Sequence, residues 1–225
     1  MSSAGRATPL GSDATEARAN MVEHQLRRRG SFDESVLEAM ARVPRERFIP
    51  EEVCHLAYDD GALPIGSGQT ISQPFIVATI CHLLELSGNE RVLDVGTGSG
   101  YQAAVLAELA AEVVTIERVP ELAERARSVL VQAGYGKVEV LVGDGSLGVP
   151  ARAPFDGIAV AAAAPVVPPA LYEQLVEGGR VVVPRGGLWG QQLVLVERTK
   201  NGPLERASVP CRFVPLVGAE GFASF

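Results

Sequence analysis

Apolar residues recur every three to four positions in the first part of the chain and later form short continuous runs. Over residues 14–29 and 31–40 they lie among charged residues at helical spacing, which predicts two amphipathic helices. Gly30 marks the end of the first helix, and Ser31 with Glu34 at capping-box spacing predicts the start of the second. The chain therefore begins with a helical extension.

From residue 91 onward, short runs of strand-forming residues alternate with helix-forming segments. Alternation of this kind is typical of a parallel sheet covered by helices. We therefore expect an α/β fold with a Rossmann-like, mostly parallel, doubly wound sheet and an antiparallel C-terminal edge. The expected strands are 91–95, 113–116, 138–142, 155–160 and 180–183, the helices 101–107, 120–133 and 169–176, and the final hairpin 192–198 with 207–213.

Three glycines at alternate positions follow the first of these strands. Gly96, Gly98 and Gly100 supply a turn that tolerates positive φ and brings the backbone close to a ligand. In the dinucleotide-binding fingerprint the third glycine would stand where Tyr101 stands. The spacing therefore argues against a pyrophosphate and suits a ligand that packs flat on the loop.

Acidic residues follow the next two strands. Glu117 ends the second strand, where a carboxylate can accept hydrogen bonds from both hydroxyls of a ribose. NAD-binding domains and S-adenosylmethionine-dependent methyltransferases share this feature, and the glycine spacing after Asp94 favours the methyltransferases. Asp144, between two glycines at the tip of the third strand, either holds the exocyclic amine of a base or forms a turn.

A polar segment rich in glycine and proline, residues 58–74, precedes this sheet and is too long for a simple connection. We expect a loop that covers a site or contributes to one. A helix is predicted from Pro74 to about Leu86. Ser72 is then either the N-cap of that helix or a functional hydroxyl.

Composition narrows the functional classes. The net charge of −7 disfavours nucleic-acid binding. Three cysteines and three histidines lack metal-ligand spacing, so we expect free thiols, a reducing compartment and no metal site. No signal-peptide core or membrane-length apolar run occurs, so we expect a cytoplasmic protein without a membrane partner, with residues 1–13 as a disordered tail. The absence of a heptad stripe favours a monomer.

Several separate blocks together resemble the protein-L-isoaspartate O-methyltransferase family. They are residues 43–48, 63–66, 68–74, 92–102, 143–145, 153–156, 162–168 and 213–217. The resemblance implies one methyltransferase domain over 14–225, with 14–90 as a helical and substrate-loop lead-in and 91–225 as the cofactor-binding sheet and C-terminal strands. It implies methyl transfer from S-adenosylmethionine, giving S-adenosylhomocysteine, to the free α-carboxylate of L-isoaspartyl residues in damaged proteins and peptides. Activity on D-aspartyl residues stays open.

The resemblance also implies roles for particular residues. Ser72 corresponds to the active-site serine, and Ser72, Gln73, Val214 and Val217 are implied on the substrate side; some family members carry a hydroxyl residue at the position of Val217. The implied cofactor-binding residues are Gln69, Thr70, Ile71, Asp94, Gly96, Thr97, Gly98, Ser99, Glu117, Asp144 and Gly145.

The chemistry of a carboxylate substrate agrees with these residues. A carboxylate is already a nucleophile at neutral pH, so the enzyme must align it and exclude water but needs no general base. Ser72 can donate one hydrogen bond to it, and no His or Asp partner for covalent catalysis lies in its segment. At the tip of the fourth strand, residues 161–165 carry no side-chain acceptor of the kind that amine methyltransferases place there.

Three alternatives stay open at this point. A related enzyme could methylate ordinary aspartate during the maturation of a specific peptide, although 225 residues leave little space for the recognition domain that such a role usually requires. A cofactor-binding module without catalysis and a nicotinamide dehydrogenase are the other two. The glycine spacing argues against the dehydrogenase.

Overall fold

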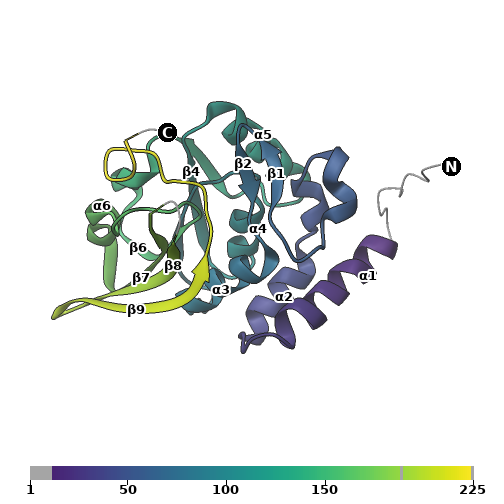
Figure 1. Cartoon of the computed structure of the whole chain (residues 1–225). Coiled ribbons are helices and arrows are strands. Elements are labelled where there is room, and N and C mark those ends of the chain that lie inside the picture. Colours follow the sequence, from purple (N-terminus) through teal and green to yellow (C-terminus); the bar gives the residue numbers. More distant parts are fainter. Residues whose placement is uncertain (1–11, 188–189, 224–225) are drawn as a thin grey trace.

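A seven-stranded sheet forms the centre of the computed structural model, which describes residues 12–187 and 190–223 (Figure 1). The strand order is β5-β4-β3-β6-β7-β8-β9. β3 to β7 run parallel, and β8 and β9 add an antiparallel edge. The strands are β3 (Arg91–Val95), β4 (Glu112–Glu117), β5 (Glu139–Val142), β6 (Phe155–Val160), β7 (Leu175–Gly186), β8 (Gln191–Thr199) and β9 (Gly202–Cys211). This arrangement confirms the predicted fold class.

Helices cover both faces of the sheet and form the N-terminal extension. The α-helices are α1 (Ser12–Asn20), α2 (Glu34–Arg42), α3 (Pro74–Leu84), α4 (Tyr101–Ala107), α5 (Pro120–Gln132) and α6 (Pro169–Glu173). α1 continues directly into the π-helix η1 (Met21–Arg27). Short 3-10 helices are η2 (Arg45–Phe48), η3 (Glu51–Leu56), η4 (Gly145–Leu147) and η5 (Pro150–Arg152).

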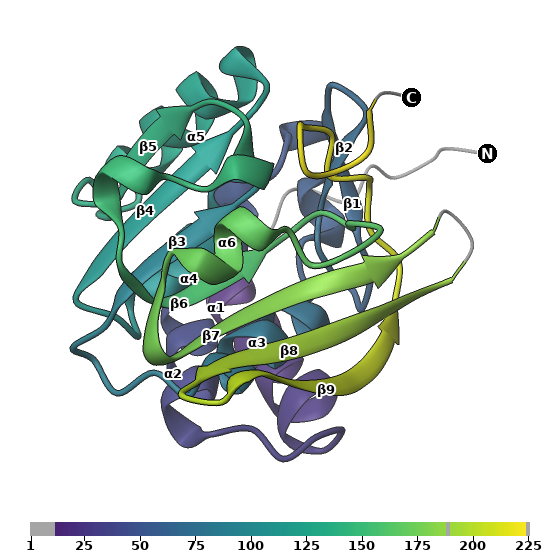
Figure 2. The ribbon, with the colours of Figure 1, turned by 90° about the vertical axis from the view of Figure 1, so that its left-hand side faces the viewer.

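Alternate residues of the strands face two separate apolar clusters. Val92 belongs to the cluster that includes residues of the N-terminal helices and of α3, α4 and α5, whereas its neighbour Leu93 belongs to the other cluster, which includes Leu171 of α6. Figure 2 shows α6 on one side of the sheet and α1 to α3 on the other. Successive side chains of a strand point to opposite faces of the sheet, so a continuous apolar run supplies apolar side chains to both faces.

The chain changes direction across the sheet between β3 and β6. After β3 it moves outward to β4 and β5, and it then returns to β6 on the other side of β3. Connections on either side of such a point lead in opposite directions, so a crevice opens at the carboxyl ends of the two strands. Ligands of open α/β sheets bind at this position, which here lies next to Gly96 and Ala161.

Some local expectations were wrong. The 58–74 segment contains an antiparallel hairpin, β1 (Leu63–Gly66) and β2 (Gln69–Ile71), rather than an irregular loop. The predicted Ser31 and Glu34 capping box is absent, because α2 has Asp33 at its N-cap and no side-chain cap bond. The predicted helix 169–176 ends at Glu173, since Leu175 pairs with Phe155 and begins β7.

The predicted N-terminal tail is only partly covered by the structure. Ser12 and Asp13 belong to α1, and residues 1–11 lie outside the described residues. Within the described ranges, no helix is long and apolar enough to cross a membrane. No group of three or more His, Cys, Asp or Glu side chains able to hold a metal ion occurs in that same part of the chain.

Candidate functional site

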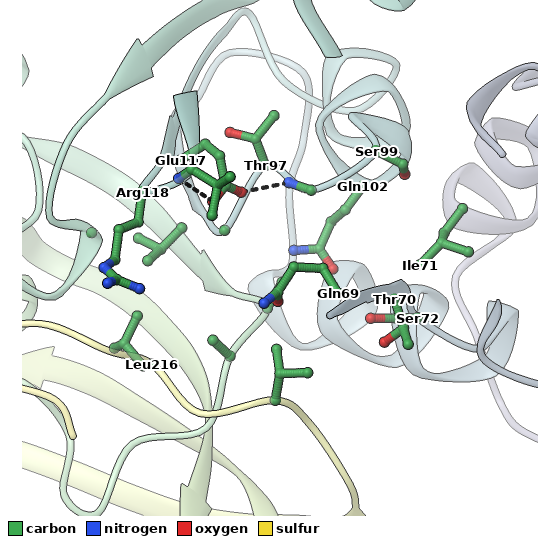
Figure 3. Close-up of a pocket in the computed structure, with 18 of the residues that line it drawn as sticks. Gln69, Thr70, Ile71, Ser72, Thr97, Ser99, Gln102, Glu117, Arg118 and Leu216 are labelled. Atoms are coloured by element: carbon green, nitrogen blue, oxygen red, sulfur yellow. Dashed lines mark hydrogen bonds between the residues drawn. The ribbon is translucent and has the colours of Figure 1, made fainter. Parts of the chain in front are cut away.

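A pocket enclosing about 870 Å³ of partly open space lies at the crevice between β3 and β6 (Figure 3). Its walls come from the β1–β2 hairpin, the glycine loop after β3, the tips of β4 and β6, and the segment after β9. The lining residues are Gln69, Thr70, Ile71, Ser72, Val77, Val95, Gly96, Thr97, Gly98, Ser99, Tyr101, Gln102, Ile116, Glu117, Arg118, Val119, Gly145, Ala161, Ala162, Val214, Pro215, Leu216 and Val217.

The glycine loop forms the strand–turn–helix that its sequence predicts. Gly96, Gly98 and Gly100 all have positive φ, at 92°, 52° and 88°. A Cβ on Gly96 would lie 3.5 Å from the Cβ of Ala161, so the loop passes close to the tip of β6. The loop therefore presents bare backbone to the pocket, as a ligand that packs against it requires.

Glu117 is a buried carboxylate at the tip of β4, only 7% exposed. Its Oε2 accepts a hydrogen bond from the Gly98 N–H at 2.8 Å, and its Oε1 accepts one from the Val119 N–H at 3.0 Å (Figure 3). Each carboxylate oxygen can accept a second hydrogen bond. The backbone thus fixes this carboxylate at the pocket wall and leaves its oxygens able to accept from the hydroxyls of a ribose, so this acceptor fits a nucleoside.

Asp94 supports the glycine loop from behind and does not itself line the pocket. Its carboxylate is fully buried and accepts hydrogen bonds from Gln102 Nε2 and Thr115 Oγ1, both at 2.8 Å. The Thr115 hydroxyl also contacts the Thr97 hydroxyl at 2.6 Å. Burial raises the pKa of Asp94 to about 6, although its two hydrogen bonds act in the opposite direction.

At the tip of β5, Gly145 lines the pocket and the preceding Asp144 does not. A Cβ on Gly145 would lie 2.6 Å from Val95 Cγ1, so only glycine fits there without a shift. Asp144 Oδ1 accepts from the Ser146 N–H and hydroxyl, and Oδ2 accepts from the Ala219 N–H. Burial would raise the pKa of Asp144, but these hydrogen bonds outweigh it and hold the pKa below the ordinary value. The turn-forming interpretation of Asp144 is therefore confirmed, and its contact with a base stays a prediction.

Ser72 lies in the connection between β2 and α3, next to Thr70 and Ile71 on one side of the pocket (Figure 3). The N-cap of α3 is Gln73, and no side chain caps the helix. The alternative that Ser72 is an N-cap is therefore wrong, and its hydroxyl is not used by the helix. Gln73 does not line the pocket; its Nε2 donates to Asp60 Oδ1 at 2.6 Å.

The segment after β9 forms the opposite wall. The Ala163 N–H donates to the Val214 carbonyl at 2.8 Å, and the Leu216 N–H donates to the Ala163 carbonyl at 2.7 Å. Ala161 and Ala162 add only methyl groups and backbone to the pocket, which agrees with the predicted lack of a side-chain acceptor there. An amine substrate would find no side-chain oxygen at this tip.

The structure brings most of the predicted site residues together. Those that line the pocket are Gln69, Thr70, Ile71, Ser72, Gly96, Thr97, Gly98, Ser99, Glu117, Gly145, Val214 and Val217. Asp94, Asp144 and Gln73 lie outside the lining. Sequence reasoning missed Gln102 and Arg118, although Arg118 directly follows the predicted ribose carboxylate and Gln102 stands in the first turn of the helix after the glycines.

Comparison with known proteins places this geometry in a family. A family model described as "Protein-L-isoaspartate(D-aspartate) O-methyltransferase" matches residues 16–221. The chain belongs to this family. It is 56% identical over 214 residues to protein-L-isoaspartate O-methyltransferase 2 of Marinobacter nauticus, covering 94% of this chain and 98% of the relative. It is 52% identical over 206 residues to the enzyme of Methanoculleus marisnigri, covering 91% of this chain and 93% of that one.

Solved structures give the same result. One protein-L-isoaspartate O-methyltransferase is 29% identical and superposes with a TM-score of 0.81, covering 91% of this chain and 67% of that chain. Another, from Plasmodium falciparum, is 25% identical with a TM-score of 0.76, covering 89% of this chain and 98% of that one. The Plasmodium protein was solved in complex with S-adenosyl-L-homocysteine.

Proposed function

We propose that this chain repairs damaged proteins by transferring a methyl group from S-adenosylmethionine to the free α-carboxylate of L-isoaspartyl residues. The observation that carries the proposal is one pocket that combines a backbone-fixed carboxylate, Glu117, with a hydroxyl, Ser72, that caps no helix among the described residues. The first suits the nucleoside of the cofactor, and the second suits a carboxylate substrate. Relatives that are 56% and 52% identical to this chain are named as enzymes with this activity.

The walls of the pocket indicate which residues would bind the cofactor. Glu117 would accept from the ribose hydroxyls, the bare backbone of the glycine loop would lie against the cofactor, and Gly145 would leave room for the base. Gln69, Thr70 and Ile71 from the hairpin would close the other side. Bound S-adenosylmethionine supplies an electrophilic methyl group on a sulfonium.

The chain's own residues need only hold the carboxylate in line and keep water out. The Ser72 hydroxyl donates a hydrogen bond to one carboxylate oxygen, which leaves the other free to face the methyl group. Because the carboxylate is ionised at neutral pH, no side chain has to remove a proton. Val214, Pro215 and Leu216 cover the pocket with apolar surface that reduces the access of water.

The test compares methyl transfer from labelled S-adenosylmethionine to two peptides that differ only in carrying isoaspartate or aspartate at one position. We expect base-labile label on the isoaspartyl peptide alone. Equal labelling of the aspartyl peptide would point to peptide maturation. Binding of the cofactor without labelling of either peptide would contradict the proposed substrate.

Ser72→Ala is the matching variant. We expect its kcat/KM on the isoaspartyl peptide to fall by about 10- to 100-fold, because the substrate carboxylate loses a hydrogen-bond donor. Affinity for S-adenosylhomocysteine and the thermal midpoint should stay close to those of the wild type, since Ser72 does not cap α3. Unchanged activity would exclude a role for this hydroxyl.

The proposal extends to the organisation and setting of the enzyme. We infer a single domain over residues 14–225, a monomeric enzyme, a cytoplasmic location and activity that does not involve nucleic acid. The free thiols of Cys54, Cys81 and Cys211 support a reducing compartment, and the net charge of −7 opposes a nucleic-acid partner. Light scattering would test the monomer against the chain mass of 23.7 kDa.

A further inference from the structure

A buried arginine lies directly behind the Ser72 side of the pocket. Arg45 begins η2 in the N-terminal extension, and it is 0% exposed. It does not line the pocket. An arginine in such a place is unusual, because a charged group leaves water at a large free-energy cost unless its hydrogen bonds and charge are satisfied.

The Arg45 guanidinium joins two points that are distant in sequence. Its Nε donates to the Ala57 carbonyl at 2.8 Å, and its Nη2 donates to the Ser72 carbonyl at 2.8 Å. The guanidinium carbon also lies 4.8 Å from the ring centroid of Tyr101, on the first turn of α4. Arg45 thus connects both ends of the segment that contains the β1–β2 hairpin to the helix after the glycine loop.

The charge of Arg45 is poorly compensated where it lies. Both of these hydrogen bonds go to neutral carbonyls, and its Nη1 is buried without a hydrogen-bond partner in the described structure. Burial lowers the pKa of Arg45, yet a guanidinium stays protonated at neutral pH. An apolar residue of similar volume would fill the same space but would leave the Ala57 and Ser72 carbonyls without this donor, so packing alone does not explain the arginine.

The hairpin itself has other anchors. Leu63 pairs with Ile71 across the two strands, and Arg125 of α5 donates through Nη2 to the Ile65 carbonyl. These contacts hold the cofactor side of the hairpin independently of Arg45. What Arg45 adds is a fixed position for the carbonyl of Ser72, at the point where β2 has ended and α3 has not begun.

We propose that Arg45 is a positioning residue that holds the backbone of Ser72 in place, so that its hydroxyl meets the substrate carboxylate. The inference rests on the proposed function for the role of Ser72. It gives the N-terminal extension a role in the site, because Arg45 of η2 places its planar guanidinium behind Ser72. Arg45 acts through Ser72 and touches no reactant.

The test uses Arg45→Met, which keeps an apolar stem of similar length and removes both donors, and Arg45→Lys, which keeps the charge and at most part of the fork. Tyr135→Phe is the matched control: Tyr135 is half-buried, and its hydroxyl donates to Glu108 at 2.8 Å rather than to the Ser72 segment. We expect the KM for the isoaspartyl peptide to rise at least about tenfold in Arg45→Met, with a smaller rise in Arg45→Lys. The dissociation constant for S-adenosylhomocysteine should change less than about threefold in both variants.

Hydrogen exchange without substrate separates this inference from the proposed function. Arg45→Met should speed exchange at amides around residues 57–60 and 72–76 and leave those of residues 63–71 unchanged. The Tyr135→Phe control should leave all three stretches unchanged. If the wild type fails to methylate the isoaspartyl peptide, the proposed function fails while the exchange result still tests the anchoring of Ser72 by Arg45. Unchanged hydrogen exchange at residue 72 in Arg45→Met would overturn the positioning role. An affinity for S-adenosylhomocysteine that falls by the same factor as the activity would also overturn it. If Arg45→Met does not fold, both measurements are made on Arg45→Lys.

Discussion

At the scale of single residues, the site is controlled by how each polar atom is used. Glu117 and Asp94 are both buried carboxylates, but Glu117 accepts from backbone N–H groups at the pocket wall and Asp94 accepts from side chains behind it. The first is placed to meet a ligand, and the second supports the loop. Their substitutions should therefore differ in effect.

For Glu117→Gln we expect cofactor binding to weaken. Each of its oxygens accepts from a backbone N–H and can accept once more from a ribose hydroxyl, so the new amide NH₂ group would remove an acceptor that the ligand uses. A lost charge-assisted hydrogen bond costs about 1 to 3 kcal/mol, or roughly 5- to 150-fold in the dissociation constant of S-adenosylhomocysteine. Glu121→Gln, on the exposed first turn of α5, is the control and should bind normally. Equal affinity in both variants would contradict the assignment of Glu117.

Asp94 predicts a pH-dependent stability. Its pKa is about 6 in the folded protein against an ordinary 3.8, so the folded state holds the proton more tightly. The protonated form of Asp94 contributes stability that is fully present below about pH 4 and is lost as the pH rises to about 6. Above that pH the protein lacks this contribution, which is on the order of 3 kcal/mol. In urea unfolding, the free energy of unfolding of Asp94→Asn relative to the wild type should therefore be about 1 to 3 kcal/mol higher at pH 8 than at pH 4.5. An equal difference at both pH values would exclude this ionisation.

At the scale of elements, two segments added to the sheet complete the pocket. The β1–β2 hairpin supplies one wall, and residues 214–217 supply the other. The residues directly after this second wall hold it in place, because the Ala219 N–H donates to Asp144 and the Glu220 N–H donates to the Ser146 hydroxyl. The end of the described chain is therefore part of the architecture of the site.

Gly218→Ala tests this attachment. A Cβ at Gly218 would lie 2.0 Å from Asp144 Oδ1 and 2.5 Å from Ser146 Oγ, so either these two side chains or the segment must shift, and the hydrogen bonds between them are disturbed. We expect the KM values for peptide and cofactor to rise by about threefold or more, with a slightly lower thermal midpoint. Gly187→Ala, where a Cβ meets nothing within 4 Å, is the control. Identical kinetics of the two variants would show that this attachment does not shape the pocket.

At the scale of the whole molecule, the apolar cluster between the sheet and the N-terminal helices contains Cys81 and packs against Cys211. Cys54 and Cys81 are buried, and Cys211 is half-buried. Burial raises the pKa of all three thiols, that of Cys211 to about 11. Chemical accessibility of the thiols therefore reports on the integrity of the fold.

We expect the native protein to react with a thiol reagent at about pH 8 roughly 100-fold more slowly than free cysteine does, because few of its thiols are ionised. In concentrated guanidinium chloride all three cysteines of the chain should react at once. A rapid reaction of one thiol in the native protein would show that its surroundings are open. The measurement needs only an absorbance change with time.

The sequence alone determined the parts of the protein that local chemistry controls. The short apolar strands of the sheet, the helices that follow them, the glycine turn after Asp94 and the carboxylate at Glu117 were all predicted, because each depends on residues within one βα unit. The family blocks then indicated the substrate. These features need no knowledge of which segments meet.

Tertiary structure decided whatever depends on distant partners. Only the fold shows that Asp144 accepts from Ala219, that Ser72 is free of the helix cap, and that Arg45 joins Ala57 to Ser72. The helix from Pro169 was predicted too long because the pairing of Leu175 with Phe155 overrides local helix preference, and α2 has Asp33 rather than Ser31 at its N-cap. Hydrogen bonds between residues far apart in sequence leave no periodic signal, so they form a recognisable pattern only when the chain is folded.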